Sequence, residues 1–184
     1  MAGEQQLVGL TPPGLPEPSG PGPAAPTGRP AQPADLPTLV ELHSQALAEL
    51  SHHRGGTVFF GLQGRGDARS AFESQLADPG QLVVVGMPSE ATTVVGFGTA
   101  RTRALSDGSL LGAIEDLFVL PAHRRQGVGR AMAGLLVGWC QAKGCVGVDA
   151  WALPGSRAAK SFFESGRFTA RALLMHHKLG GAGR

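Results

Sequence analysis

The feature that most constrains this chain is a basic, glycine-containing loop between an apolar stretch and an amphipathic helix. Residues 110–120 are mostly apolar and predict a buried strand, which Pro121 ends. A loop follows, and the helix expected over 129–143 begins directly after it. Apolar side chains recur around that helix at three- and four-residue spacing, at Val128, Met132, Leu135, Leu136 and Trp139. The segment therefore predicts a strand, a tight loop and a packed helix in direct succession.

The loop brings glycines and arginines to the amino end of that helix. The first N–H groups of a helix have no partners within it, and with the helix dipole they favour an anion. Gly127 and Gly129 let the backbone approach such a ligand closely. Arg124, Arg125 and Arg130 offer charge-assisted hydrogen bonds that suit phosphate oxygens. The residues alone therefore predict a pyrophosphate-binding turn.

Two common nucleotide-binding motifs do not fit this loop. A Rossmann fingerprint needs its first glycine directly after the strand, whereas residues 121–126 intervene here, and Met132 stands where the third glycine is required. A Walker A loop needs Gly-Lys-Ser or Gly-Lys-Thr, and the chain contains neither.

The rest of the chain predicts a mixed α/β fold. Periodicity and capping residues predict helices over 35–50, 67–76 and 156–165, in addition to 129–143. Strands are expected over 81–85, 93–103, 110–120, 145–151 and 169–179, and the segment 52–66 is left without an assignment. Strands that pair through turns first and alternate with helices later indicate a mixed sheet covered by helices.

The amino-terminal part differs from the rest in composition. Residues 1–34 hold nine of the fourteen prolines, and Glu4, Glu17 and Arg29 are their charged side chains. Such a stretch buries too little apolar surface to offset its ordering entropy, so residues 1–27 are expected to be a disordered tail. The spacing Pro23-Ala24-Ala25-Pro26 leaves open a ligand for a proline-recognition module.

Composition excludes several classes of protein. A net charge of +2 is too small to indicate a nucleic-acid partner. The longest apolar stretch is too short to span a membrane, and the amino terminus lacks a signal-peptide pattern, which favours a cytoplasmic protein. Cys140 and Cys145 cannot form a disulfide framework and are expected in the core. No metal site is expected, because neighbouring strand residues such as His176 and His177 face opposite sides.

The loop and its surroundings resemble the GNAT superfamily of acetyl-CoA-dependent N-acetyltransferases. Arg124-Arg125-Gln126-Gly127-Val128-Gly129 is similar to the family's Gln/Arg-x-x-Gly-x-Gly/Ala signature, and Leu117-Phe118-Val119-x-Pro121 precedes it. Residues 159–168 resemble the family's Ala-x-x-x-Tyr-Glu-x-x-Gly-Phe ending. The resemblance implies a three-layer αβα fold with a mostly antiparallel mixed sheet, formed by residues 28–180, with 181–184 as a flexible end.

The resemblance also implies how acetyl-CoA would bind. The pantetheine arm would lie along the backbone of Leu117, Phe118 and Val119, and the N–H of Val119 would hold the oxyanion. Ser156 and Phe163 would line the same arm. The pyrophosphate would lie on the loop and the helix end, namely on Arg124, Arg125, Gln126, Gly127, Val128, Gly129 and Arg130.

The acceptor amine must lose a proton, because side-chain amines titrate near ~10. Glu115 is the candidate base, since regular alternation puts it on the face of Leu117 and Val119 and puts Asp116 on the opposite face unless a bulge intervenes. The pattern Ile114-Glu115-Asp116-x-Phe118-Val119 particularly resembles spermidine/spermine acetyltransferases, which implies an acceptor site at Glu115 and Asp116. Trp151 and the segment His52-His53-Arg54 are further candidates for acceptor contacts.

One departure from the family keeps a second function open. Many GNAT enzymes protonate the leaving thiolate with a tyrosine, but Phe163 occupies that position and the chain contains no tyrosine. The first hypothesis is direct transfer of acetyl to a primary amine, of a small molecule or a peptide, in a ternary complex. The alternative is a catalytically weak acyl-CoA-binding sensor or partner module. A homodimer is compatible with both.

Overall fold

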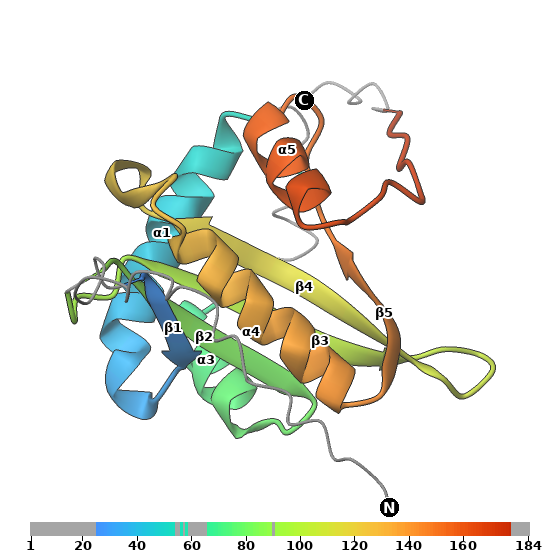
Figure 1. Cartoon of the computed structure of the whole chain (residues 1–184), viewed down its shortest axis with the longest axis horizontal. Coiled ribbons are helices and arrows are strands. Elements are labelled where there is room, and N and C mark those ends of the chain that lie inside the picture. The colour runs from blue at the N-terminus through green and yellow to red at the C-terminus, as the bar shows by residue number, and fades with distance from the viewer. Residues whose placement is uncertain (1–24, 54–55, 57, 59–65, 90, 178–184) are drawn as a thin grey trace, which may run out of the picture.

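A five-stranded sheet forms the centre of the computed structural model, which describes residues 25–53, 56, 58, 66–89 and 91–177. The strand order follows the chain from β1 to β5 (Figure 1). Neighbouring strands are antiparallel except for β4 and β5, which are parallel. The strands are β1 (Thr27–Pro30), β2 (Gln81–Met87), β3 (Gly96–Ala104), β4 (Leu110–Val119) and β5 (Cys145–Ala150).

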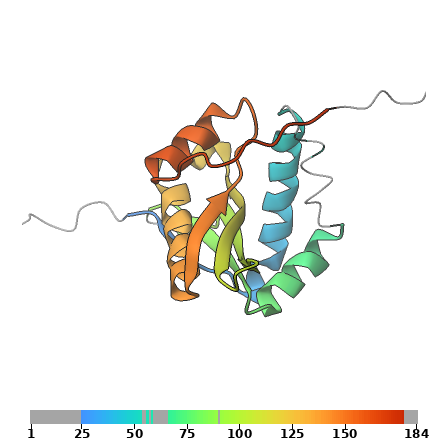
Figure 2. The ribbon, with the colours of Figure 1, turned by 90° about the vertical axis from the view of Figure 1, so that its right-hand side faces the viewer.

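Helices cover both faces of the sheet. Figure 2 shows α1 (Leu36–Ser51) and α3 (Ala68–Ala77) on one side and α4 (Val128–Ala142) on the other. The helix α5 (Arg157–Ser165) follows β5 and lies near the amino end of α4 (Figure 1). Two 3-10 turns, η1 (Pro33–Asp35) and η2 (Pro121–His123), precede α1 and α4. The expected three-layer αβα architecture with a mostly antiparallel mixed sheet is therefore confirmed.

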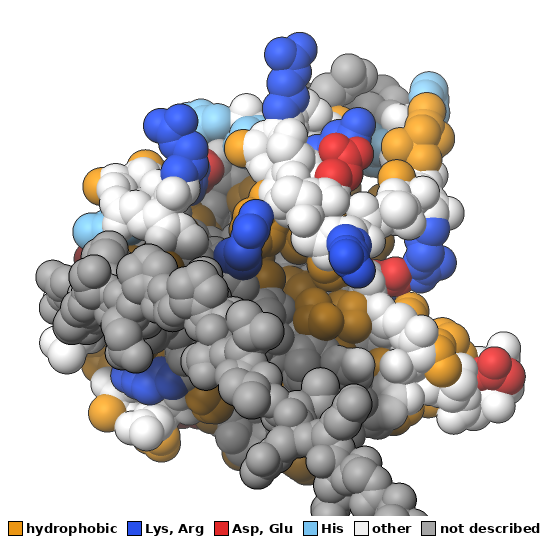
Figure 3. All heavy atoms as spheres, viewed as in Figure 1, with side chains coloured by type: hydrophobic (Ala, Val, Ile, Leu, Met, Phe, Trp, Pro, Cys, Tyr) orange, Lys and Arg blue, Asp and Glu red, His pale blue; other side chains and the backbone are white. Residues whose placement is uncertain are grey.

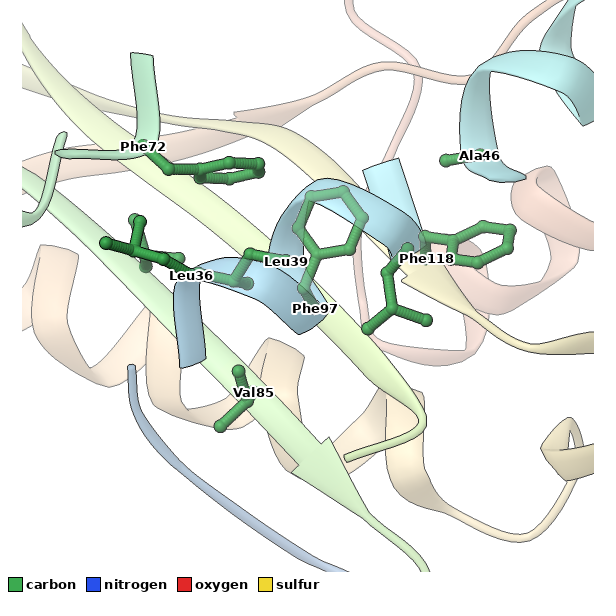
Figure 4. Close-up of a cluster of buried hydrophobic side chains, with 9 residues drawn as sticks. Leu36, Leu39, Ala46, Phe72, Val85, Phe97 and Phe118 are labelled. Carbon is green, nitrogen blue, oxygen red and sulfur yellow. The ribbon is translucent and has the colours of Figure 1, made fainter. Parts of the chain in front are cut away.

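Each face of the sheet has its own apolar cluster, because alternate residues of a strand face opposite sides. On the α1 and α3 side, Leu39 and Phe72 pack against Phe97 and Phe118 of the sheet (Figure 4). On the α4 side, Met132 and Leu136 pack against other strand residues, among them Ile114. On α1, Leu39, Leu42 and Ala46 are buried, and so is His43, whose ring lies against Phe72 and Phe97.

The strand β1 is absent from the sequence-based expectation. Its residues pair antiparallel with β2, and Arg29 lies opposite Val85. A Cβ added to Gly28 would come 3.0 Å from Leu135 Cδ1, so the strand passes close to α4. Thr27, assigned above to the tail, thus belongs to the sheet, whereas residues 1–24 lie outside the described residues. A four-residue edge strand that ends in Pro30 has no alternating pattern by which it could be recognised.

The prediction of a strand over 169–179 is wrong for residues 169–177, the part that the structure describes. Residues 169–177 carry no strand pairing, and 178–179 lie outside the described residues. Leu173, Leu174 and Met175 are between 73% and 80% exposed. Their apolar side chains are consecutive rather than alternating, so a strand here would turn apolar groups to both faces. Arg171 nevertheless holds this segment to β5 through an ion pair with Asp149.

Candidate active site

The strands β4 and β5 separate halfway along β4. Their pairing ends where Ile114 lies opposite Ala150, although β4 continues to Val119. Figure 1 shows β5 turning away from β4 toward α5. The Leu120 N–H donates to the Val95 carbonyl on the β3 side, at 2.9 Å. Since N–H directions alternate along an antiparallel ladder, the N–H groups of Val119 and Leu117 point to the side that β5 has left.

The loop after β4 collects backbone N–H groups at the start of α4. Arg125 and Gly127 have positive φ angles of 61° and 90°, and Gly127 is the N-cap residue of the helix. The first helical bond after the cap runs from the Ala131 N–H to the Gly127 carbonyl, at 3.0 Å. The three N–H groups between them, at 128–130, have no acceptor within the helix. The loop thus gathers backbone N–H groups beside the glycines and arginines singled out in the sequence, and anion binding here stays a prediction.

The arginines of the loop differ in their partners. The Arg124 guanidinium donates to the Val119 carbonyl at 2.8 Å and to Glu49 Oε2 at 2.6 Å, and it lies over the Phe118 ring. Arg124 therefore ties the loop to β4 and α1. Arg125 and Arg130 are exposed, and Figure 3 shows basic side chains bordering the surface between α4 and α5. The Gln126 amide donates to the Ala122 carbonyl at 3.2 Å within the loop.

A β-bulge in β4 places the two candidate carboxylates on one face of the sheet. Asp116 lies opposite Thr99 but Ile114 lies opposite Ala100, so Glu115 is an extra residue without its own partner. Ile114 and Leu117 both pack in the cluster on the α4 side. The two residues between them therefore face the α1 and α3 side. The expectation that Glu115 shares the face of Leu117 and Val119 is thus wrong, because the bulge resets the alternation.

The two carboxylates have different hydrogen-bond donors. Glu115 Oε1 accepts from Arg101 Nε at 2.6 Å and from Arg103 Nη2 at 3.1 Å, and the Glu115 side chain is 8% exposed. Asp116 Oδ2 accepts from the Thr99 hydroxyl at 2.6 Å, and Thr99 is buried. Glu115 thus accepts from two guanidinium groups, whereas Asp116 accepts from the Thr99 hydroxyl.

A third carboxylate lies on the neighbouring strand. Asp149 is opposite Ala113 in the β4–β5 register and accepts two hydrogen bonds from the Arg171 guanidinium. These bonds lower the pKa of Asp149 below its usual range, and the charge of Arg103 lowers it further by a smaller amount. Asp149 is therefore ionised at neutral pH, and both of its carboxylate oxygens accept hydrogen bonds from Arg171.

Aromatic residues of α5 lie beside the amino end of α4. A Cβ added to Gly129 would come 3.4 Å from the Phe162 ring and 3.7 Å from Val119 Cγ2. Phe162 stacks edge-on against Phe163, whose ring also contacts Phe168. Sequence analysis singled out Phe163 but missed Phe162, which the adjacent aromatic pair could have indicated. Ser156 occupies the N-cap position of α5, but its side chain makes no capping hydrogen bond.

The remaining candidates are dispersed. Trp151 directly follows β5 and is 45% exposed. His52 and His53 lie at the end of α1, and Arg54 falls outside the described residues. Cys140 is fully buried, as expected, and burial is the main cause that raises the pKa of its thiol to about 11.

In the part of the chain that the structure describes, no group of three His, Cys, Asp or Glu side chains is placed to hold a metal ion. Among the same residues, none of the helices has the length and apolar character needed to cross a membrane.

Comparison with known proteins identifies the family in which this arrangement occurs. The model of the acetyltransferase (GNAT) family matches residues 47–167, which include the loop, the bulge and both diverging strands. No curated protein gives a significant match. Many solved structures do match.

Three solved structures illustrate the shared fold. An acetyltransferase of Trypanosoma brucei is 22% identical, with 84% of this chain and 99% of the other covered and a TM-score of 0.60. Glucosamine-6-phosphate N-acetyltransferase of Arabidopsis thaliana is 18% identical, with 85% and 99% covered and a TM-score of 0.61. AAC(6′)-Iy, in complex with a CoA bisubstrate analogue, is 20% identical, with 85% and 100% covered and a TM-score of 0.65.

Proposed function

The chain belongs to the GNAT family of acetyltransferases, and from this premise we propose that it transfers an acetyl group from acetyl-CoA directly to a primary amine. The observation that carries the proposal is the open edge of β4, with the Val119 N–H pointing into it, next to the amino end of α4 and its glycine loop. Both features lie on one continuous segment, so one extended ligand can contact them together. The solved structure of AAC(6′)-Iy with CoA has the same fold and supports acetyl-CoA as the co-substrate.

The loop and the start of α4 would bind the pyrophosphate of acetyl-CoA. The backbone N–H groups of Val128, Gly129 and Arg130 supply the donors, and Gly127 removes the side chain that would obstruct them. The exposed Arg125 and Arg130 add charge. Arg124 would have a positioning role, because its guanidinium donates to the Val119 carbonyl and to Glu49 and so fixes the loop relative to β4 and α1.

The open edge of β4 would bind the pantetheine arm. Leu117 and Val119 present backbone groups there, and Phe118 anchors the strand by packing into the core on the other face. The Val119 N–H is placed to stabilise the negative charge that develops on the thioester oxygen, an interaction worth about 3 kcal/mol in comparable enzymes. Phe162 and Phe163 close the opposite wall from α5.

We assign the proton-accepting role to Asp116 and a positioning role to Glu115. The sequence favours Glu115, but the hydrogen bonds from Arg101 and Arg103 both end on its Oε1. Asp116 is on the same face and one residue closer to Val119, and the Thr99 hydroxyl donates to its Oδ2. The chain contains no tyrosine that could act as the acid of other family members, so the thiolate, with a pKa near ~8.5, would take its proton from water.

The absence of tyrosine also supports the second candidate, an acyl-CoA-binding module with little turnover. Thiol release from acetyl-CoA separates the two functions, measured with a panel of polyamines, aminoglycosides, amino acids and short peptides. An enzyme releases thiol with at least one acceptor class. A binding module releases none, although acetyl-CoA raises its melting temperature.

The loop itself is tested by Gly127→Ala. The alanine would have to adopt a φ angle near 90°, and its Cβ would lie 2.8 Å from Pro26 Cγ. We therefore expect the acetyl-CoA-induced rise in melting temperature to disappear. Gly134→Ala is the matched control, because this helical glycine has open space around its Cβ position. A Gly127→Ala protein that binds acetyl-CoA normally would show that the loop is not the pyrophosphate site.

A further inference from the structure

Thr99 places a buried hydroxyl in an apolar part of the sheet. Its neighbours Gly98 and Ala100 face the α4 side, so Thr99 faces the side of α1 and α3. There it lies opposite Val83 of β2 and two residues after Phe97, which both belong to the apolar cluster. Thr99 is 2% exposed. Because a buried hydroxyl without a hydrogen bond costs free energy and valine has nearly the same shape, apolar packing alone does not account for a threonine here.

The Thr99 hydroxyl donates to one of the two candidate carboxylates. Its oxygen is 2.6 Å from Asp116 Oδ2, a length typical of a hydroxyl that donates to a carboxylate. The two residues lie directly opposite each other in the β3–β4 register, so the hydrogen bond crosses a single strand pair. Threonine is branched at Cβ, which restricts the rotation of its side chain. The donor therefore has a fixed position relative to β4.

The bulge in β4 makes a fixed donor important for Asp116. Glu115 is the extra residue, and the regular register resumes at Asp116. A bulge bends the strand and increases its twist, so alternation alone does not determine the direction of the next side chain. The carboxylate of an aspartate also rotates over a broad range about its Cβ–Cγ bond. A hydrogen bond from Thr99 restricts both freedoms.

The residues on one face of β3 support the two carboxylates separately. Thr99 donates to Asp116, whereas Arg101 and Arg103, which follow at alternate positions, donate to Glu115. A substitution at Thr99 can thus act on Asp116 and leave both arginine bonds to Glu115 in place.

We propose that Thr99 is a positioning residue for acetyl transfer, whose hydroxyl holds the Asp116 carboxylate in the orientation that accepts the proton of the amine. The inference rests on the proposed function and on Asp116 as its base. Proton transfer requires the two heavy atoms to come within about 2.6–3.2 Å, so a rotated carboxylate loses rate even when both substrates are bound. One hydroxyl takes one of about four acceptor positions of a carboxylate, so the Thr99 bond does not itself exclude the amine.

Thr99→Val and Thr99→Ser test this role. Valine keeps the branched shape and removes the donor, whereas serine keeps the donor. We expect Thr99→Val to lower kcat by about tenfold to a hundredfold and Thr99→Ser to stay within about threefold of the unmodified protein. KM for acetyl-CoA should not change, because neither the open edge of β4 nor the glycine loop is altered. Thiol release is measured with whichever of spermidine, neamine, lysine and triglycine gives the highest kcat.

The matched control is Thr102→Val, at a half-buried threonine of the same strand. Its hydroxyl is 3.5 Å from the Gly80 carbonyl oxygen, away from the carboxylates, so we expect no change in kcat. The acetyl-CoA-induced rise in melting temperature shows that each variant is folded. If Thr99→Val lacks this rise, Thr99→Ala, which also removes the donor, is measured in its place.

A double-mutant cycle with Asp116→Asn separates positioning from a general effect on the fold. If Thr99 acts through Asp116, Thr99→Val should change kcat by less than about twofold once Asp116 is replaced. An equal loss in both backgrounds would contradict the inference. So would an unchanged kcat in Thr99→Val, or a Thr99→Ser protein as slow as Thr99→Val.

The outcomes also distinguish this inference from the function on which it rests. Acetyl transfer that is insensitive to Thr99→Val overturns the positioning role and leaves the proposed function intact. Transfer that is insensitive to Asp116→Asn overturns the base and the positioning role together, again with the proposed function intact. Thiol release with none of the four amines would overturn acetyl transfer itself and the inference with it.

Discussion

At the scale of single residues, the bulge at Glu115 and Asp116 determines on which face of the sheet the two candidate carboxylates lie. Alternation along a regular strand predicts that neighbouring residues face opposite sides, and this is why the sequence alone puts Asp116 away from Glu115. One extra residue in β4 brings them to the same face. Their partners come from β3, twelve to seventeen residues earlier in the chain. Nothing in the local sequence of β4 reveals such long-range neighbours.

Substitution of each carboxylate by its amide tests the assigned roles. We expect Asp116→Asn to lower kcat by about 10²–10⁴, the usual contribution of a general base, because the amide cannot accept the proton. Glu115→Gln should lower kcat by less than about tenfold, because its carboxylate is bound by arginines rather than by substrate. Thiol release at saturating acetyl-CoA gives kcat, and calorimetry shows whether acetyl-CoA still binds. The reverse order of the two variants would return the base to Glu115.

At the scale of elements, periodicity predicts the long elements well and the short ones poorly. The helix expected over 129–143 is observed as Val128–Ala142, because a strong apolar stripe and a glycine-rich start define it. The strands after residue 80 are likewise found near their predicted ends as far as β5. β1 is not predicted, because four residues with a terminal proline carry no period. Residues 169–177 carry no strand pairing, and their apolar residues are consecutive rather than alternating.

An ion pair fastens β1 to the start of α1. Arg29 donates to both carboxylate oxygens of Asp35, at 2.7 and 2.8 Å, and the Gln32 N–H adds a third bond at 2.7 Å. These bonds, Arg29 first, hold the pKa of Asp35 below its usual value. A lowered carboxyl pKa means that the stabilisation is present above the unfolded-state pKa and is lost as the pH falls through the folded-state pKa.

Asp35→Asn should therefore destabilise the protein at neutral pH but not in acid. We expect a loss of about 1–3 kcal/mol in the free energy of unfolding at pH 7, typical of hydrogen bonds to charged groups. The difference from the unmodified protein should shrink as the pH falls below about 4. Urea unfolding at several pH values measures it. Glu73→Gln, at an exposed pair with Arg69, should change little at any pH, and a loss at Asp35 that persists in acid would contradict the electrostatic origin.

At the scale of the whole molecule, Cys140 reports on the integrity of the α4 side of the core. Its thiol is fully buried, and its raised pKa of about 11 keeps it protonated near neutral pH. Thiol reagents react with the thiolate, so in the Cys145→Ser protein we expect labelling at pH 8 to require unfolding. The labelling rate should rise through the urea transition in parallel with the loss of circular dichroism. Rapid labelling of the folded protein would show that the cluster opens locally.

The site as a whole divides into a part that is local in sequence and a part that is not. The strand, the loop and the helix that would hold acetyl-CoA are consecutive, so their residues predict the anion-binding turn directly. The proposed acceptor side combines β3, β4, β5 and the segment that carries Arg171. The partners of its carboxylates, Arg101 and Arg103 among them, become visible only when the register of the sheet is known.

The contact between Pro26 and Gly127 has a practical consequence for labelling. A Cβ on Gly127 would nearly touch the Pro26 ring, so the peptide that enters β1 passes directly over the glycine loop. A label attached at Ala25, the residue before Pro26, would thus lie close to the glycine loop. If the loop holds the pyrophosphate as proposed, the signal of a fluorophore at Ala25 should change when acetyl-CoA is added.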